Sequence, residues 1–203
     1  MDYLAIDLGS SSGRAIVGSV ESGRIQVREI HRFTNRPLQL PTGLYWNAPQ
    51  LFEEIKRALA LCAQQEVELA SAGLDSWAVD YALLSRSGEL LGLPRHYRDP
   101  RTRGAVDAIC QRLGRAAIYE TTGIQFQEFN TLCQLWAEGR DARERLDVAN
   151  RLLFMPDLFH YWLTGVQASE QTNASTSQIY DPRKGAWATR LLDELELPSH
   201  FLP

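Results

Sequence analysis

The sequence predicts an α/β fold that opens with antiparallel strands and continues through a crossover helix. Two apolar runs, Leu4–Ile6 and Ala15–Val17, flank a short Gly- and Ser-rich turn, and another run begins after a second turn at Glu21–Arg24. A helical pattern of apolar residues then leads into a further apolar run near residue 69. This order predicts a ribonuclease-H-like (actin-like ATPase) domain, with a mixed sheet whose antiparallel N-terminal three-strand meander is flanked by helices.

The first part of the chain supplies the predicted sheet and its crossover helix. Asn47 is a suitable N-cap for that helix, and Pro49 fits its first turn. The proline-containing stretch 34–46 is predicted to be a loop with an edge strand. After the meander, the predicted elements are a helix at 48–65 and strands at 69–75 and 79–84.

The remaining chain is predicted to be mostly helical. Asp99-Pro100 has the form of an N-cap followed by a first-turn proline, and Gly114 is a natural helix end. Asn130 is predicted to cap another helix, and 169–178 is predicted to be a polar loop. The predicted elements are helices at 100–113, 116–121, 131–138, 140–149, 156–164 and 188–195, and a short buried strand or turn at 152–155.

Composition narrows the class of protein. The 203 residues with 44% hydrophobic content are enough for one domain with a substantial core. A net charge of −4 argues against nucleic acid as a partner, and no apolar run approaches the roughly 20 residues that span a membrane. Cys62, Cys110 and Cys133 are widely spaced and form no CxxC motif. We therefore expect a cytoplasmic protein with no nucleic-acid or membrane partner.

The turn that follows Asp7 has the composition of a phosphate site. Glycine permits close backbone approach, while backbone N–H groups and serine hydroxyls donate to phosphate oxygens. Asp7 ends the first apolar run, and its carboxylate suits Mg²⁺ held through water. The turn is neither a P-loop nor a dinucleotide-binding motif, and an ordinary hairpin loop is the alternative interpretation. The predicted phosphate-binding residues are Ser10, Ser11, Ser12, Gly13 and Arg14.

Several segments, taken together, resemble one enzyme family. They lie in the same order and at similar spacing along nearly the whole chain, which makes a chance match of all of them improbable. The segments are Asp7–Arg14, Glu29–Phe33, Gly92–Pro94, Tyr97–Asp99, Gly123–Phe126, Phe129–Leu132, Met155–Asp157, Leu163–Gly165 and Thr172–Ala174. With these segments, the sequence resembles the FGGY carbohydrate kinases and, within them, the rhamnulokinases.

The resemblance implies an enzyme that phosphorylates L-rhamnulose at its C1 hydroxyl with ATP and Mg²⁺. Members of the family have two actin-like domains with the active site in the cleft between them. Residues 1–203 resemble the N-terminal domain, incomplete at its C-terminal end, so the second domain is an expected partner in cis or in trans. The catalytic aspartate of the family lies in a His-Asp segment that would follow Pro203. No His-Asp pair occurs in this sequence, so no general base is assigned.

The resemblance also implies a sugar site. The family's sugar-binding segment, usually Trp-Gly-Val-Asp, matches Trp77, Ala78 and Asp80, and Phe129 matches an aromatic position in the sugar pocket. Ala78 replaces the usual glycine, which would be costly if that position needed a positive φ. Aromatic platforms with a few directed polar groups suit sugars. Alternatively, Trp77 and Phe129 are core aromatics and Asp80 pairs with Arg98 or a backbone amide.

Other functions remain consistent with the sequence. A non-catalytic sugar-binding or regulatory module would keep the sugar platform and lack turnover. A chaperone or filament protein of the actin-like class would need no sugar platform, and the Trp77–Asp80 segment counts against it. Among sugar kinases, Ala78 leaves room for another ketose such as L-fuculose or D-xylulose.

Overall fold

In the computed structural model, which describes residues 1–203, the chain opens with the three predicted antiparallel strands. These are β1 (Asp2–Leu8), β2 (Ser12–Glu21) and β3 (Arg24–Thr34). The later strand β6 (Leu69–Ser76) pairs with β1 in parallel, which gives the order β3-β2-β1-β6. The predicted mixed sheet with its N-terminal meander is confirmed.

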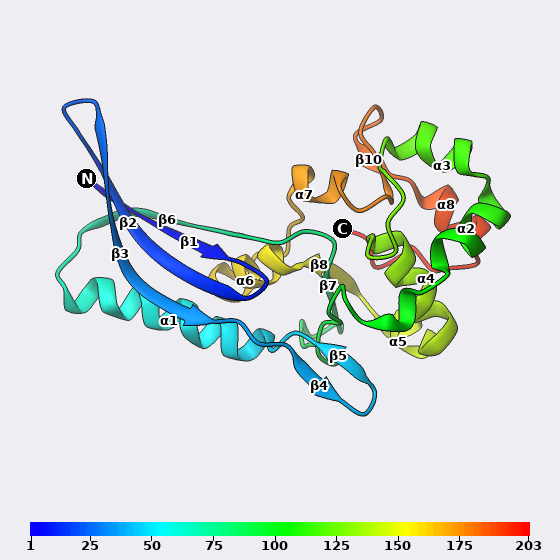
Figure 1. The fold of residues 1–203 in the computed structure, drawn as a ribbon, viewed down its shortest axis with the longest axis horizontal. Coiled ribbons are helices and arrows are strands. Elements are labelled where there is room, and N and C mark those ends of the chain that lie inside the picture. The colour runs from blue at the N-terminus through cyan, green and yellow to red at the C-terminus, as the bar shows by residue number, and fades with distance from the viewer. The chain divides into compact units, whose positions relative to one another are not determined.

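One face of this sheet is covered by the crossover helix α1 (Ala48–Gln64), which packs against β3 (Figure 1). Burial alternates along β1, where Leu4, Ile6 and Leu8 are 2–3% exposed. The predicted cap is present, because Asn47 Oδ1 accepts a hydrogen bond from the N–H of Gln50 at 3.3 Å. The apolar face of α1 is formed by Ala48, Leu51, Ile55, Ala58 and Cys62.

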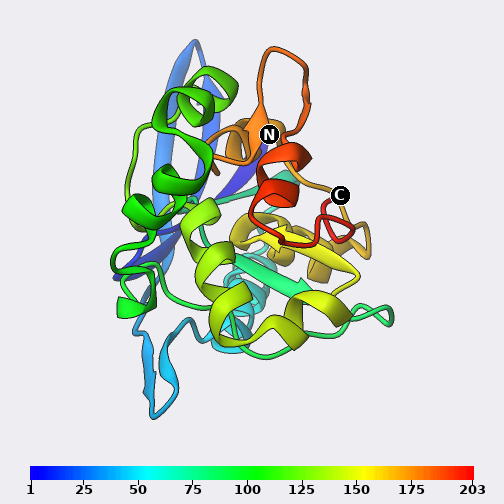
Figure 2. The ribbon, with the colours of Figure 1, turned by 90° about the vertical axis from the view of Figure 1, so that its right-hand side faces the viewer.

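The chain divides into two compact units, Met1–Leu38 with Trp46–Trp77, and Gln39–Tyr45 with Ala78–Pro203. At the centre of the second unit, β7 (Tyr81–Leu84) pairs antiparallel with β8 (Arg151–Phe154). Figure 2 shows helices surrounding this strand pair. The predicted fifth strand therefore exists, but it begins at Tyr81 and belongs to a separate sheet. All residues of β7 are buried, as expected for a short strand within a core.

The remaining elements are short and lie close to the predicted positions. The helices are η1 (Pro100–Thr102), α2 (Ala105–Leu113), α3 (Arg115–Thr122), α4 (Thr131–Asp141), α5 (Arg143–Val148), α6 (Met155–Thr164), α7 (Gln171–Ser175) and α8 (Thr189–Glu194). The strands are β4 (Leu38–Leu40), β5 (Gly43–Tyr45), β9 (Tyr180–Asp181) and β10 (Ala186–Trp187). None of the helices combines the length and apolar character needed to cross a membrane.

Three local predictions differ from the structure. The helix expected from Pro100 is divided into η1 and α2, because Gly104 between them adopts a left-handed conformation with φ of 75°. Asn130 makes no side-chain cap to α4, and its amide instead donates to the carbonyl oxygen of Gln125 at 2.8 Å. The predicted polar loop contains the short helix α7, which is capped by the carboxylate of Glu170.

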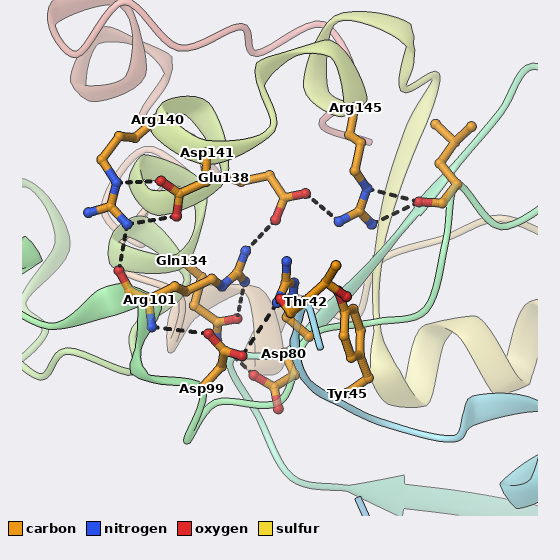
Figure 3. A network of polar contacts seen from close by, with 12 residues as sticks. Thr42, Tyr45, Asp80, Asp99, Arg101, Gln134, Glu138, Arg140, Asp141 and Arg145 are labelled. Carbon is orange, nitrogen blue, oxygen red and sulfur yellow. Dashed lines mark hydrogen bonds and ion pairs between the residues drawn. The ribbon is translucent and has the colours of Figure 1, made fainter. Parts of the chain in front are cut away.

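A buried carboxylate holds α4 within the second unit. Glu138 is 2% exposed, and its carboxylate forms ion pairs with Arg101 and, at 2.5 Å, with Arg145 (Figure 3). Arg101 also donates to Oε1 of Gln134 at 3.2 Å. Because an ion desolvated in a protein interior is costly, each of these charges depends on the others being present.

We expect Arg101→Met to lower the free energy of unfolding by about 3–5 kcal/mol, because it leaves a buried carboxylate with one partner fewer. Urea denaturation followed by circular dichroism measures this change. The control is Arg190→Met, whose ion pair with Glu194 is on the surface and should contribute less than about 1 kcal/mol. Equal effects of the two substitutions would contradict the importance of the buried pair.

Candidate functional site

The turn between β1 and β2 brings the predicted phosphate-binding residues together. The strand register places Asp7 opposite Arg14, and the Nε of Arg14 donates to Asp7 Oδ2 at 2.9 Å. The N–H of Gly9 donates to the carbonyl oxygen of Ser12 at 2.8 Å and closes the turn. Gly13 is required by packing, because a Cβ there would lie 2.2 Å from the ring of Phe33. The turn is therefore fixed by contacts within its own unit.

Asn35, which directly follows β3, holds this turn in place by hydrogen bonds. Its position in the sequence gives no indication of this role. Its side chain is buried, and Nδ2 donates to the carbonyl oxygen of Gly9 at 2.9 Å. Its backbone N–H donates to the carbonyl oxygen of Ser11, also at 2.9 Å. The carbonyl groups of Gly9, Ser11 and Ser12 thus accept hydrogen bonds from the protein itself. These three engaged carbonyl oxygens present less negative charge to an approaching anion than free carbonyl oxygens would.

A second carboxylate lies beside Asp7. The parallel register of β1 and β6 pairs Asp7 with Asp75, and both residues are exposed. Asp75 Oδ1 accepts a hydrogen bond from the N–H of Ser76 at 2.8 Å, which leaves its second oxygen available. Exposed carboxylate oxygens are the donors that Mg²⁺ prefers, commonly through its own water ligands. The residues present therefore fit a magnesium ion next to the phosphate turn.

Trp77 ends the first unit as part of an aromatic pair. Its ring centroid lies 3.9 Å from that of Trp46, with the two planes inclined by 31°. Trp46 is completely buried, whereas Trp77 is half-buried. The buried ring of Trp46 supports the half-buried ring of Trp77, which offers an apolar surface of the kind that sugar rings contact.

The residues after Trp77 form an unusual three-residue turn. The N–H of Asp80 donates to the carbonyl oxygen of Ala78 at 2.9 Å, and Val79 between them has φ of 70°. A β-branched residue in this region is a genuine outlier that costs about 1–3 kcal/mol. Ala78 itself is not among the residues with positive φ. Replacement of the family's glycine by Ala78 therefore brings no left-handed strain, because the strained position is Val79.

Asp80 is a buried carboxylate with both oxygens occupied. Its side chain is 0% exposed, Oδ1 accepts from Nε2 of Gln134 at 2.7 Å, and Oδ2 accepts from the N–H of Tyr97 at 3.1 Å. The ring of Tyr97 meets that of Phe129 edge to face, with centroids 6.3 Å apart. Phe129 is 39% exposed and able to contact a ligand. Direct contact of Asp80 with a sugar stays a prediction, and the observed bonds give it an orienting role.

Helix α4 contributes buried polar residues that hydrophobic periodicity does not reveal. Thr131, Gln134 and Glu138 recur at intervals of three and four residues, which places them on one face of the helix. All three are at most 2% exposed. A pattern search assigns such polar residues to the solvent side, so only their regular spacing next to the apolar residues could have indicated this face.

Asp157 is a buried acid in the first turn of α6. Its side chain is 4% exposed, and Oδ1 accepts a hydrogen bond from the N–H of Glu170 at 3.2 Å. Oδ2 makes no hydrogen bond. Burial raises the pKa of the Asp157 carboxyl to about 6. The Asp157 carboxyl therefore changes its charge close to neutral pH. Its partner Glu170 is the N-cap of α7, the helix that contains Thr172–Ala174.

Comparison with known proteins identifies the family of this chain. The model of the "FGGY family of carbohydrate kinases, N-terminal domain" matches residues 2–203. The chain belongs to the FGGY family. Rhamnulokinase of Pectobacterium atrosepticum is 42% identical over 203 residues, which are 99% of this chain and 41% of that protein. Rhamnulokinase of Bacillus subtilis is 39% identical over 204 residues, again 41% of its length. The FGGY chain thus spans about two fifths of these relatives.

Solved structures confirm the fold class. A ligand-bound xylulose kinase from Lactobacillus acidophilus superposes with a TM-score of 0.86 at 17% identity, covering 100% of this chain and 41% of that one. Glycerol kinase of Plasmodium falciparum with ADP gives 0.77 at 13% identity, covering 100% and 42%. The predicted actin-like ATPase fold of this FGGY chain is therefore confirmed.

We expect Asn35→Ala to loosen the phosphate turn selectively, because it removes the bond to the Gly9 carbonyl. Amide hydrogen exchange of residues 9–13, followed by NMR, should accelerate more than the global loss of stability explains. Asn47→Ala is the matched control, since it removes the α1 cap in the same unit and costs about 1 kcal/mol without touching the turn. The same exchange pattern in both variants would refute the role of Asn35.

We expect Asp157→Asn to raise the free energy of unfolding at pH 7 by about 1–3 kcal/mol, because the folded protein no longer ionises a buried acid. A pKa raised above its unfolded value makes the contribution of Asp157 to stability fall as pH rises from about 4 to 6. The stability gained by Asp157→Asn should therefore grow across this range, which urea denaturation measures.

Two features of the same unit serve as controls for the Asp157 experiment. The pKa of Asp181 is lowered by hydrogen bonds from Lys184 and Arg183, although burial opposes this, so Asp181→Asn should reduce stability at pH 7. Burial and the nearby Arg98 lower the pKa of His96 to about 4. This group makes stability rise with pH in both proteins, so the contribution of Asp157 is obtained from the difference between the two curves. A curve for Asp157→Asn that matches the unsubstituted protein would contradict the assignment.

Proposed function

We propose that this FGGY chain is the N-terminal domain, residues 1–203, of a cytoplasmic kinase that phosphorylates L-rhamnulose at its C1 hydroxyl with MgATP. The observation that carries the proposal is the β1–β2 turn, whose carbonyl groups are engaged by Asn35 and by the turn itself. The choice of L-rhamnulose over L-fuculose or D-xylulose follows the rhamnulokinases, to which the chain is about 40% identical.

In this proposal the turn binds the phosphate groups of ATP. Backbone N–H groups and hydroxyls of Ser10, Ser11 and Ser12 donate to phosphate oxygens, Gly13 allows close approach, and Arg14 supplies positive charge. Asp7, with Asp75 beside it, would hold Mg²⁺ through water. The ion, when bound, neutralises part of the phosphate charge. Phosphoryl transfer depends mainly on such positioning and electrostatic stabilisation, so a rigid turn is well suited to it.

The sugar is proposed to bind at the Trp77–Asp80 segment and at Phe129. Trp77 offers a flat apolar surface that Trp46 supports from behind. Ala78 presents its backbone and one methyl group, and Phe129 contributes a second aromatic ring. Asp80 orients Phe129 through Tyr97, whose backbone N–H donates to Asp80 and whose ring meets Phe129.

The catalytic step needs groups that residues 1–203 do not provide. A general base must accept the proton of the sugar hydroxyl, and we assign it to a C-terminal domain joined in cis or supplied in trans. The same domain would complete the nucleotide site. Residues 1–203 alone should therefore bind ligands weakly and turn over little or no substrate.

The test measures ADP release with L-rhamnulose for residues 1–203 alone and for residues 1–203 fused to the C-terminal part of the Pectobacterium atrosepticum rhamnulokinase. We expect no turnover alone and measurable turnover in the fusion. Asp7→Asn in the fusion is expected to lower kcat/KM by about tenfold or more, because it removes a carboxylate that would hold the ion through its water ligands.

Each outcome of this test separates the proposed function from an alternative. Turnover by residues 1–203 alone would overturn the assignment of the base to another domain. Faster turnover of L-fuculose or D-xylulose by the fusion would overturn the choice of sugar. Calorimetric binding of L-rhamnulose without turnover in any form would favour a non-catalytic sugar-binding module.

A further inference from the structure

Two side chains of α4, here called the α4 clamp, hold the strained turn at Val79. The clamp consists of Thr131 and Gln134, which are 0% and 1% exposed. Thr131 Oγ1 donates to the carbonyl oxygen of Val79 at 2.9 Å, and Gln134 Nε2 approaches the same oxygen at 3.4 Å. A left-handed β-branched residue persists only where surrounding contacts determine it, and these bonds supply such contacts.

Gln134 also reaches the second candidate sugar segment. Its Nε2 lies 2.7 Å from Asp80 Oδ1 and 3.0 Å from the carbonyl oxygen of Phe129. The side-chain amide of Gln134 therefore links the turn at Val79 to the backbone of Phe129. Displacement of this amide would alter both segments at once.

The orientation of the Gln134 amide is itself fixed. Its Oε1 accepts from Nη2 of Arg101 at 3.2 Å, and a guanidinium group can only donate (Figure 3). The NH₂ group is consequently directed toward the acceptors on Val79, Asp80 and Phe129. Arg101 is held in turn by its ion pair with Glu138. The buried charges of the second unit thus determine which end of the amide faces the candidate site.

We propose that Gln134 is a positioning residue for the sugar, which sets the Val79 turn and Phe129 in their binding arrangement while touching no substrate itself. The ligand class is a polyhydroxylated ketose, because the segments so positioned offer an aromatic ring and backbone polar groups. This inference rests on the proposed sugar site. It adds a residue to which the FGGY resemblance assigned no role.

The experiment compares Gln134→Met and Thr131→Val with Thr122→Val in residues 1–203. Thr122 is a matched control, since it is buried in the same unit and its Oγ1 donates to the carbonyl oxygen of Ile118 at 2.9 Å. The first readout is hydrogen exchange of the Asp80 amide, which reports the turn without any ligand. The second is an NMR titration with L-rhamnulose, with MgATP titrated separately.

We expect Gln134→Met to weaken L-rhamnulose binding by about tenfold, the equivalent of one well-placed hydrogen bond to a charged group. Thr131→Val should weaken it by about threefold, and Thr122→Val should leave it within about twofold. Exchange of the Asp80 amide should accelerate at least about tenfold in both clamp variants, whereas MgATP binding stays unchanged. If Gln134→Met does not fold, Thr131→Val carries the test.

A rescue variant distinguishes positioning from general stability. Val79→Gly in the Gln134→Met protein lets the turn form without strain, because glycine adopts positive φ readily. It should restore slow exchange of the Asp80 amide and part of the L-rhamnulose affinity.

Unchanged Asp80 exchange in both clamp variants would overturn the inference, as would sugar affinity equal to that of Thr122→Val. Failure of the unsubstituted chain to bind L-rhamnulose would overturn the proposed sugar site instead. In that case, the exchange measurement still decides whether the clamp holds the turn.

Discussion

The carboxylate of Glu138, shared by Arg101 and Arg145, is the interaction on which the second unit depends. Burying one carboxylate requires the guanidinium groups, and burying those groups requires the carboxylate, so the three charges constrain each other. Such a group tolerates few arrangements, unlike an apolar core that repacks when its volume is kept. It therefore contributes geometric specificity beyond its net stability. Gln134 links these charges to the segment that follows Trp77, because it accepts a hydrogen bond from Arg101 and donates one to Asp80.

The two candidate binding regions share one physical solution. At the β1–β2 turn, Asn35 donates to the carbonyl oxygens of Gly9 and Ser11. At the sugar segment, Gln134 and Thr131 engage the carbonyl oxygen of Val79. In both places a buried side chain donates a hydrogen bond to a backbone carbonyl oxygen of the candidate site. That oxygen is then engaged within the protein, which limits the groups that the site presents to a ligand. Buried polar atoms with partners are the rule in proteins, and here those partners also determine what a ligand would meet.

The sequence was sufficient for most of the fold because the fold depends on local signals. Alternation in β1, the Asn47 cap of α1 and glycine at helix ends are all properties of neighbouring residues. The turn at Asp7 could be predicted for the same reason, since its residues are contiguous. Asn35, Gln134 and Asp75 could not, because each acts on a segment distant in the chain. The strain at Val79 was equally hidden, since valine gives no sign of a positive φ.

The contact between Gly13 and the ring of Phe33 has an evolutionary consequence. Gly13 belongs to the turn and Phe33 to a different strand, yet there is no room for a methyl group between them. A larger residue at position 13 is compatible with this turn only if the ring at position 33 moves or is replaced by a smaller side chain. The two positions should therefore change together among related sequences, and a substitution at either one has to be designed together with the other.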